Sequence, residues 1–316
     1  MDEFGIIRRY FASQAPTRAD VMLGIGDDAA VLAVPPDREL VVTVDNLVAG
    51  VHFPPEFAAE AVGHRALAVS LSDLAAMGAE PAWVLLALTL PEADEPWLDG
   101  FSRGFFALAR RHGVALVGGN MARGPLDIGV TAHGLVRKGE ALTRKGAQPG
   151  DLIYITGAPG DAAAGLKLLQ AGHRDYTHPC LKRFAYPEPR LAEGASLRSI
   201  ASACIDVSDG LLADLGHLLE ARGFGARVAL EKLPLSDELR ALHGTEEARR
   251  LALTGGDDYE LCFTVHANRA AVAEARLQEL GCPVTCIGTV EGQAGIECVD
   301  QAGKVHRYLA SGYRHF

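Results

Sequence analysis

The stretch "GIGDDAAV", from Gly24 to Val31, places two adjacent aspartates in the middle of an apolar run that is typical of a β-strand. An unpaired buried carboxylate costs free energy, so Asp27 and Asp28 must reach solvent, hydrogen-bond donors or a cation. The small residues around them allow a backbone or a ligand to approach closely. We therefore interpret the stretch as an acidic turn. The rest of the chain indicates which of these groups its carboxylates contact.

The composition of the 316 residues is that of a globular protein, long enough for one large α/β domain or two ordinary ones. The formal net charge of −10 argues against a nucleic-acid groove and a membrane-surface protein, although metal ions could bridge the chain to an anionic substrate. The sequence has no apolar run of transmembrane length, no signal-peptide layout and no CxxC pair among its six cysteines. We expect a cytoplasmic protein with reduced thiols and no nucleic-acid or membrane partner.

Strand-like and helix-like segments alternate along the chain, which favours the α/β class. Residues 39–45 are predicted to form a buried strand, and residues 59–79 have apolar side chains at helical spacing. The polar segment from Arg137 to Asp151 is rich in glycine and lysine and contains a Pro-Gly turn, as domain boundaries often do. The sequence therefore predicts two consecutive α/β domains, covering residues 1–137 and 138–316.

Acidic residues recur where predicted strands end or predicted helices begin. They are Asp27, Asp28, Asp45, Asp73, Asp206, Asp209, Asp257, Asp258 and Glu260. Each alone has a structural explanation; Asp209, for example, could cap the helix that follows it. Crowded together, such carboxylates would repel one another and raise one another's pKa values. A divalent cation removes this repulsion, and hard oxygen ligands favour Mg²⁺ over zinc.

Two glycine-containing segments could accommodate the phosphates that usually accompany Mg²⁺. "VGGN" (117–120) ends a predicted strand, and "TGAPGDAAAG" (156–165) opens a predicted helix whose first amides could bind an anion. The second segment could equally be only a tight connection. The sequence contains no Walker A, kinase catalytic-loop, GxSxG or HExxH motif, which excludes a P-loop enzyme.

Six motifs in a fixed order give the chain a strong resemblance to a known family. They are "LGIGDDAAV", "TVDNLVAGVHF", "LAVSLSDLAAMGAEP", "ALTRKGAQPGD", "DVSDGLLADLGHL" and "TGGDDYELCFT". They resemble the thiamine-monophosphate kinase family, part of the superfamily of aminoimidazole ribonucleotide synthetase, from Phe4 to the final "SGYRHF". The resemblance implies an N-terminal domain (1–137) with a mixed sheet and helices on one face, which binds metal and ATP and dimerises through its sheet. It also implies a C-terminal α/β domain (138–316) that completes the active site.

The resemblance further implies an activity and a set of site residues. The family transfers the ATP γ-phosphoryl group to thiamine monophosphate with several Mg²⁺ ions, giving thiamine diphosphate. The implied metal positions are Asp28, Thr43, Val44 through its main chain, Asp45, Asp73, Asn120, Asp206 and Asp209. The implied ATP positions are Gly119, Asn120, Arg144 and Ser208, of which Arg144 is also assigned a catalytic role together with Asp209. The implied thiamine-phosphate positions are His52, Asp257 and Tyr313.

The residues are compatible with this chemistry. A phosphate monoester has a second pKa near 6, so the acceptor is largely an oxyanion at neutral pH and needs no general base. Catalysis can then depend on alignment and charge neutralisation, to which Arg144 would contribute. Each assigned side chain also has a simpler interpretation. Arg144 could be a surface cation, His52 a hydrogen-bonded turn histidine, and Tyr313 the cover of a hydrophobic edge.

Three positions depart from the commoner family pattern, and alternatives to the kinase stay open. Asn120 stands where many members have aspartate, Asp257 where glutamate is commoner, and Val44 where threonine is frequent. The first cysteine is Cys180 and the chain ends without one, which argues against selenophosphate synthetase and against a hydrogenase-maturation dehydratase. The remaining alternatives are a related enzyme with another acceptor and a non-catalytic regulator that binds nucleotide or metal.

Overall fold

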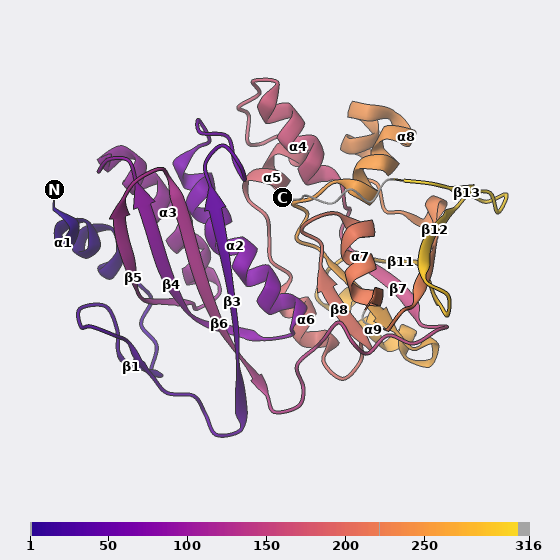
Figure 1. Ribbon diagram of the computed structural model, residues 1–316, viewed down its shortest axis with the longest axis horizontal. Helices are drawn as coiled ribbons and strands as arrows, with labels where there is room; N and C mark the ends of the chain where they lie inside the picture. Colours follow the sequence, from indigo (N-terminus) through magenta and orange to yellow (C-terminus); the bar gives the residue numbers. More distant parts are fainter. Residues whose placement is uncertain (1, 221, 309–316) are drawn as a thin grey trace. The chain divides into compact units, whose positions relative to one another are not determined.

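The computed structural model describes residues 2–220 and 222–308. The chain divides into two compact units, the first comprising Met1–Leu74 with Ala79–Gly139 and the second Ala75–Gly78 with Glu140–Phe316. Each unit has its own β-sheet and its own helices (Figure 1). Across the described residues, no helix combines the length and the apolar character that a membrane crossing requires.

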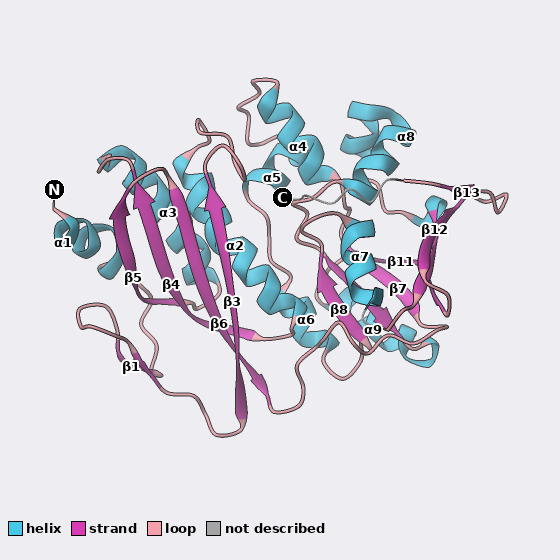
Figure 2. Ribbon diagram, viewed as in Figure 1, coloured by secondary structure: helices cyan, strands magenta, loops and turns pink. Residues whose placement is uncertain are grey.

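The described residues of the first unit form a four-stranded sheet in the order β3-β6-β4-β5. The strands are β3 (Arg38–Val48), β4 (Glu80–Leu90), β5 (Ala115–Arg123) and β6 (Asp127–Arg137). β4 and β5 run parallel and the other neighbours antiparallel, so the sheet is mixed. Two helices, α2 (Ala59–Ala76) and α3 (Glu95–Arg111), lie on one face of it (Figure 2), as the resemblance implied. The short helices α1 (Glu3–Ile6) and η1 (Ile7–Ala12) precede them.

The opposite face of this sheet is partly open. Side chains alternate along a strand, and on β3 the even-numbered Leu40, Val42 and Val44 are 45%, 53% and 65% exposed. A small two-stranded sheet, β1 (Val21–Leu23) with β2 (Val31–Leu32), packs against the buried Trp83 of β4 on this unit. In the stretch "GIGDDAAV", only the last residue, Val31, belongs to a strand. The rest of the stretch forms the connection between β1 and β2.

The described residues of the second unit form a seven-stranded sheet in the order β13-β12-β9-β11-β7-β10-β8. The strands are β7 (Leu152–Thr156), β8 (Ala203–Asp206), β9 (Gly225–Ala229), β10 (Leu261–Val265), β11 (Val284–Glu291), β12 (Gly295–Val299) and β13 (Val305–His306). β12 and β9 run parallel, whereas the other neighbours are antiparallel.

Several helices surround this second sheet. They are α4 (Asp161–Gln170), α5 (Pro179–Ala185), α6 (Leu191–Leu197), α7 (Leu211–Glu220), α8 (Asp237–Thr254) and α9 (Ala270–Glu279), with the 3₁₀ turns η2 (Leu230–Lys232) and η3 (Ala267–Arg269). Leucines of α7 and inward side chains of the strands form its main hydrophobic core. Burial of this apolar surface positions the end of β8 and the start of α7, where three predicted site residues lie: Asp206, Ser208 and Asp209.

Candidate active site

In the first unit, β3 and α2 bring two predicted aspartates together. Asp45 lies on the helix-facing side of β3, where the Ser70 hydroxyl of α2 donates a hydrogen bond to Asp45 Oδ2 at 2.8 Å. On the same side, the Thr43 hydroxyl donates to Asp73 Oδ2. Burial, followed by the negative charge of Asp73, raises the pKa of Asp45 to about 6 against the opposing effect of Ser70. The group thus brings two carboxylates and two hydroxyls together on one side of β3.

Ser70 is a member of this group that sequence reasoning missed. The signal was present in "SLSD", because Ser70 precedes Asp73 by three residues and such residues lie on one face of a helix. Among the described residues, no group of three or more His, Cys, Asp or Glu side chains is placed to hold a metal ion. The structure therefore shows a carboxylate pair with two hydroxyls rather than a larger acidic cluster.

The other predicted residues of the first unit lie at separate places. Asp28 is exposed in the β1–β2 turn, and the Val44 side chain points to the face of β3 opposite Asp45. Asn120 is exposed on β5 after Gly119, which has a φ of 154°. A β-carbon at Gly119 would lie 2.7 Å from the carbonyl carbon of Leu86, so a larger residue would disturb the pairing with β4.

His52 follows β3 in a tight turn. Its Nδ1 accepts a hydrogen bond from the Val48 amide at 2.9 Å, so the proton of the neutral ring lies on Nε2. The histidine is thus a hydrogen-bonded turn residue, which was one of its two interpretations. The contact does not test the assigned substrate role, which stays a prediction.

In the second unit, the turn between β8 and α7 carries Ser208 and Asp209. The buried Asp214 of α7 accepts the amide hydrogens of Ser208, Asp209 and Gly210 at 3.1, 3.0 and 3.1 Å. Burial raises the pKa of Asp214 to about 6, although the amide hydrogen bonds act in the opposite direction. Asp206 is buried at the end of β8. Sequence reasoning missed Asp214, whose signal was an aspartate in the first turn of the helix.

The segment from Gly256 to Glu260 lies against this turn. The Asp257 amide donates to Ser208 O and the Tyr259 amide to Val207 O, both at 2.8 Å. Asp257 and Tyr259 have φ values of 71° and 51°, in the left-handed region that residues other than glycine rarely adopt. Such strained residues concentrate at functional sites.

Arg144 is exposed in a segment that lies along β8. The Cys204 amide of β8 donates to Thr143 O at 3.1 Å, and a β-carbon at Gly146 would lie 2.7 Å from the carbonyl carbon of Ser202. The close approach fixes the backbone that carries Arg144, whereas the side chain extends into solvent. Tyr313 lies outside the described residues.

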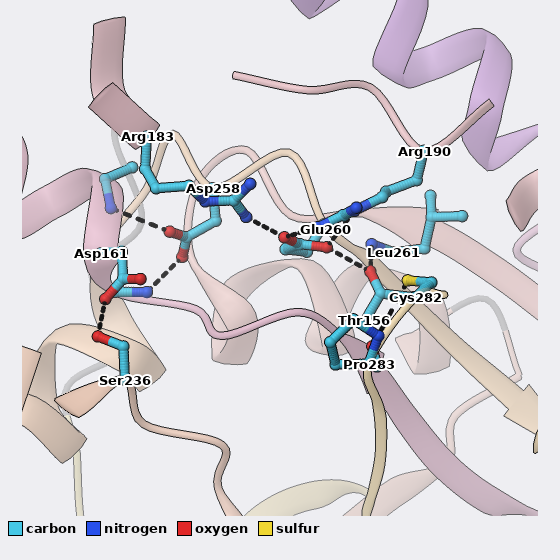
Figure 3. A network of polar contacts seen from close by, with 12 residues as sticks. Thr156, Asp161, Arg183, Arg190, Ser236, Asp258, Glu260, Leu261, Cys282 and Pro283 are labelled. Atoms are coloured by element: carbon cyan, nitrogen blue, oxygen red, sulfur yellow. Dashed lines mark hydrogen bonds and ion pairs between the residues drawn. The ribbon is translucent and has the colours of Figure 1, made fainter. Parts of the chain in front are cut away.

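The first amides of α4 do not form a free anion site. The carboxyl group of Asp258 accepts the Gly160 amide at 2.7 Å and the Ala162 amide at 3.4 Å (Figure 3). Two amides at the start of α4 are thus occupied by a carboxyl group of the same unit, which favours the tight connection over phosphate binding by segment 156–165. An open cavity of about 690 Å³ lies beside α7 instead, with Asp209, Phe224 and Tyr308 in its walls.

Known proteins match this chain along nearly its whole length. Family models of AIR synthase related proteins match residues 26–136 with the N-terminal domain and residues 148–301 with the C-terminal domain. A thiamine-monophosphate kinase of Salmonella typhimurium is 47% identical, with 99% of this chain and 98% of the relative covered.

Solved structures agree with these matches. The crystal structure of a thiamine-monophosphate kinase from Stenotrophomonas maltophilia K279a has a TM-score of 0.88 at 46% identity, covering 97% of this chain and 98% of that one. A structure of AaThiL complexed with AMPPCP and TMP has a TM-score of 0.79 at 32% identity, covering 92% of each chain. The predicted two-domain fold is thereby confirmed, and the chain belongs to the thiamine-monophosphate kinase family.

Proposed function

We propose that this protein transfers the γ-phosphoryl group of ATP to thiamine monophosphate, giving thiamine diphosphate and ADP in the last step of thiamine diphosphate biosynthesis. The observation that carries the proposal is the 47% identity to a thiamine-monophosphate kinase over nearly the whole of both chains. The relative AaThiL, complexed with AMPPCP and TMP, supports the same pair of substrates. The acceptor phosphate is largely ionised at neutral pH, so no side chain needs to remove a proton from it. The side chains need only to align the two substrates and to neutralise the negative charge of their phosphates.

The carboxylate pair of the first unit fits Mg²⁺. Asp45 and Asp73 would supply hard oxygen ligands, and burial, followed by the nearby charge of Asp73, raises the pKa of Asp45 to about 6. Mg²⁺ needs only one or two carboxylates, because waters and substrate phosphates complete its shell. A bound ion would neutralise charge on the phosphates. We keep Asp28, Thr43, the Val44 carbonyl, Asn120, Asp206 and Asp209 as further ligands in the proposal.

The remaining residues have roles in binding. We assign ATP contacts to Gly119, Asn120, Arg144 and Ser208, and thiamine-phosphate contacts to His52, Asp257 and Tyr313. His52 Nε2 carries the proton of the neutral ring and can donate to a phosphate oxygen, since Nδ1 already accepts the Val48 amide. Arg144 and Asp209 are the catalytic residues of the proposal. The exposed guanidinium of Arg144 would stabilise the negative charge that develops on the transferred phosphoryl group.

We also propose a homodimer formed through the open sheet face of the first unit. Leu40, Val42 and Val44 form an exposed apolar row on β3, and Met22 and Val31 of the adjoining small sheet are 64% and 52% exposed. Contiguous apolar surface of this kind marks interaction sites. A cytoplasmic location remains part of the proposal, and the six free cysteines agree with a reducing compartment.

A product assay tests the function directly. The purified protein, supplied with ATP, Mg²⁺ and thiamine monophosphate, should form equimolar thiamine diphosphate and ADP, and omission of thiamine monophosphate should abolish ADP formation. ATP binding without thiamine diphosphate would contradict the kinase and favour the non-catalytic regulator.

Asn120 gives a prediction about metal affinity. An asparagine offers a carbonyl oxygen but no charge, so Asn120→Asp should lower the Mg²⁺ concentration for half-maximal activity by about 10-fold, equivalent to about 1.4 kcal/mol. Asn268→Asp, which adds the same charge at an exposed position of the second unit, is the control and should leave the titration unchanged. Identical Mg²⁺ titrations for Asn120→Asp and the native protein would remove residue 120 from the metal site.

A further inference from the structure

A buried charged group lies directly after the strained segment of the second unit. Glu260 is 0% exposed and accepts hydrogen bonds from Arg190 Nε and Nη2, each at 2.7 Å, and from the Thr156 hydroxyl at 2.5 Å. Arg183 completes an ion pair with the same carboxylate (Figure 3). Burial alone would raise the pKa of Glu260, but the two guanidinium groups hold it below its ordinary value. We name these four residues the Glu260 cluster.

The Glu260 cluster and Asp258 anchor the strained backbone from both sides of Tyr259. Asp258 and Glu260 alternate with Asp257 and Tyr259, so the buried carboxyl groups belong to every second residue of the segment. Asp258 is tied to the start of α4 and Glu260 to the arginines, while the residues with left-handed φ lie beside them. A strained conformation persists only where the surrounding structure fixes it, and these anchors do so here.

Tyr259 adds a direct contact to the residue assigned to substrate. Its hydroxyl donates to Asp257 Oδ1 at 3.2 Å, while its own amide is held by Val207 O at 2.8 Å. Tyr259 is 7% exposed, so burial of the ring restricts the position of this hydroxyl. The Asp257 carboxylate is thus oriented by a side chain whose backbone belongs to the same anchored segment.

Because the side chain of Asp257 is short, the position of its carboxylate depends strongly on the anchored backbone. Aspartate has one rotatable bond fewer than the glutamate that commonly stands here in the family. The position of its carboxylate therefore depends more directly on the φ and ψ of residue 257 and on the contact with Tyr259. A longer side chain could compensate for a shifted backbone, whereas Asp257 cannot.

We propose that Tyr259 and the Glu260 cluster are positioning residues, which hold the Asp257 carboxylate where it meets the thiamine-phosphate substrate. This rests on the proposed function, because it takes Asp257 as a substrate contact. A purely structural role is the competing interpretation, since buried ion pairs also occur in cores without a function. The two differ in what they predict for the two substrates: positioning affects thiamine monophosphate selectively, whereas loss of structure affects stability and both substrates.

The variant Tyr259→Phe tests the proposal with little risk to folding, because it keeps the ring and the backbone and deletes one hydroxyl. We expect KM for thiamine monophosphate to rise about 5-fold, as for loss of one hydrogen bond, with KM for ATP and the melting temperature unchanged. Tyr154→Phe is the matched control, because it deletes another tyrosine–carboxylate hydrogen bond, to Glu274 at 2.7 Å, and should leave both KM values unchanged. An unaltered KM for thiamine monophosphate in Tyr259→Phe overturns the role of Tyr259.

A double-mutant cycle shows whether the effect passes through Asp257. In an Asp257→Asn background, Tyr259→Phe should change the dissociation constant of thiamine monophosphate, measured by calorimetry, by less than about 2-fold. An undiminished 5-fold effect in that background contradicts positioning of Asp257. A wild-type protein that forms no thiamine diphosphate overturns the proposed function itself, whereas an active wild type with an unaffected Tyr259→Phe overturns only this inference.

Arg190→Lys tests the cluster separately. Lysine keeps the charge but loses the two-pronged contact with Glu260, so the segment should shift without leaving a buried carboxylate unpaired. We expect a rise of about 5-fold or more in KM for thiamine monophosphate, with KM for ATP close to wild type. A lower melting temperature with both KM values unchanged, or with both raised to the same extent, would assign the cluster a structural role only.

Discussion

Replacing Asp73 by asparagine is expected to lower kcat/KM for thiamine monophosphate at least about 100-fold without destabilising the protein. Even residues that only support metal ligands contribute about 10- to 100-fold, and Asp73 is a proposed ligand itself. Asparagine can still accept the Thr43 hydroxyl, so the local hydrogen bond survives. The change also removes a negative charge that raises the pKa of Asp45. Loss of this repulsion should increase the free energy of unfolding by about 1 kcal/mol.

Two measurements separate lost function from lost structure in this variant. Steady-state kinetics give kcat/KM, and thermal unfolding with and without Mg²⁺ gives stability. Mg²⁺ should raise the melting temperature of the wild type more than that of Asp73→Asn. Asp99→Asn, at an exposed position of α3, removes the same charge elsewhere and should behave as wild type in both measurements. Wild-type kcat/KM in Asp73→Asn would exclude Asp73 from the site.

The same pair makes metal-free stability depend on pH. Burial and Asp73 raise the pKa of Asp45 from 3.8 to about 6 in the folded protein, so the unfolded chain releases this proton first as the pH rises. The folded state therefore loses stability between about pH 4 and pH 6 and remains destabilised above that range. The stability gained by Asp73→Asn should be small near pH 4 and largest above pH 6, which denaturant titrations at both ends of the range can measure.

The resemblance named Thr43, Asp45 and Asp73 as metal positions, and strand and helix periodicity explains why the structure brings these three residues together. Thr43 and Asp45 are two residues apart and therefore share a face of β3, and the α2 pattern brings Asp73 to the sheet. The same alternation turns the Val44 side chain to the open face, so a metal contact of Val44, which stays a prediction, would have to use the main chain. The fold class followed from alternating strands and helices and from the six ordered motifs.

The contacts that sequence reasoning missed join residues far apart in the chain. Asp258 satisfies the start of α4 from 98 residues away, so periodicity around residue 160 could not show that its amides are occupied. Arg190 reaches Glu260 across 70 residues. Both acidic residues were identified in sequence as members of an acidic turn, but their burial, and hence their structural partners, depended on the packing of the second unit. Whether the other predicted ligands bind metal stays a prediction.

Helix packing in the first unit is another long-range feature, and it carries the largest expected effect on stability. Gly63 of α2 and Gly104 of α3 lie where the two helix backbones meet. A β-carbon at Gly104 would lie 2.8 Å from the carbonyl carbon of Glu60 and overlap its oxygen, and one at Gly63 would lie 2.8 Å from the carbonyl carbon of Phe101. Backbone atoms cannot turn aside as a flexible side chain can, so the helices would have to separate.

Gly104→Ala should therefore lower the free energy of unfolding by about 3 kcal/mol or more, because separating α2 from α3 also loosens the packing of buried Phe101 and Phe105. The melting temperature should fall by about 6–12 °C. Gly216→Ala in α7 is the matched control, since its new β-carbon meets Ile296 Cδ1 only at 4.0 Å. That substitution should stabilise the protein by about 0.5–1 kcal/mol through helix propensity. The same glycine-to-alanine substitution is thus expected to change the free energy of unfolding in opposite directions at the two helical positions. Equal effects at both positions would show that backbone contact does not set the spacing of α2 and α3.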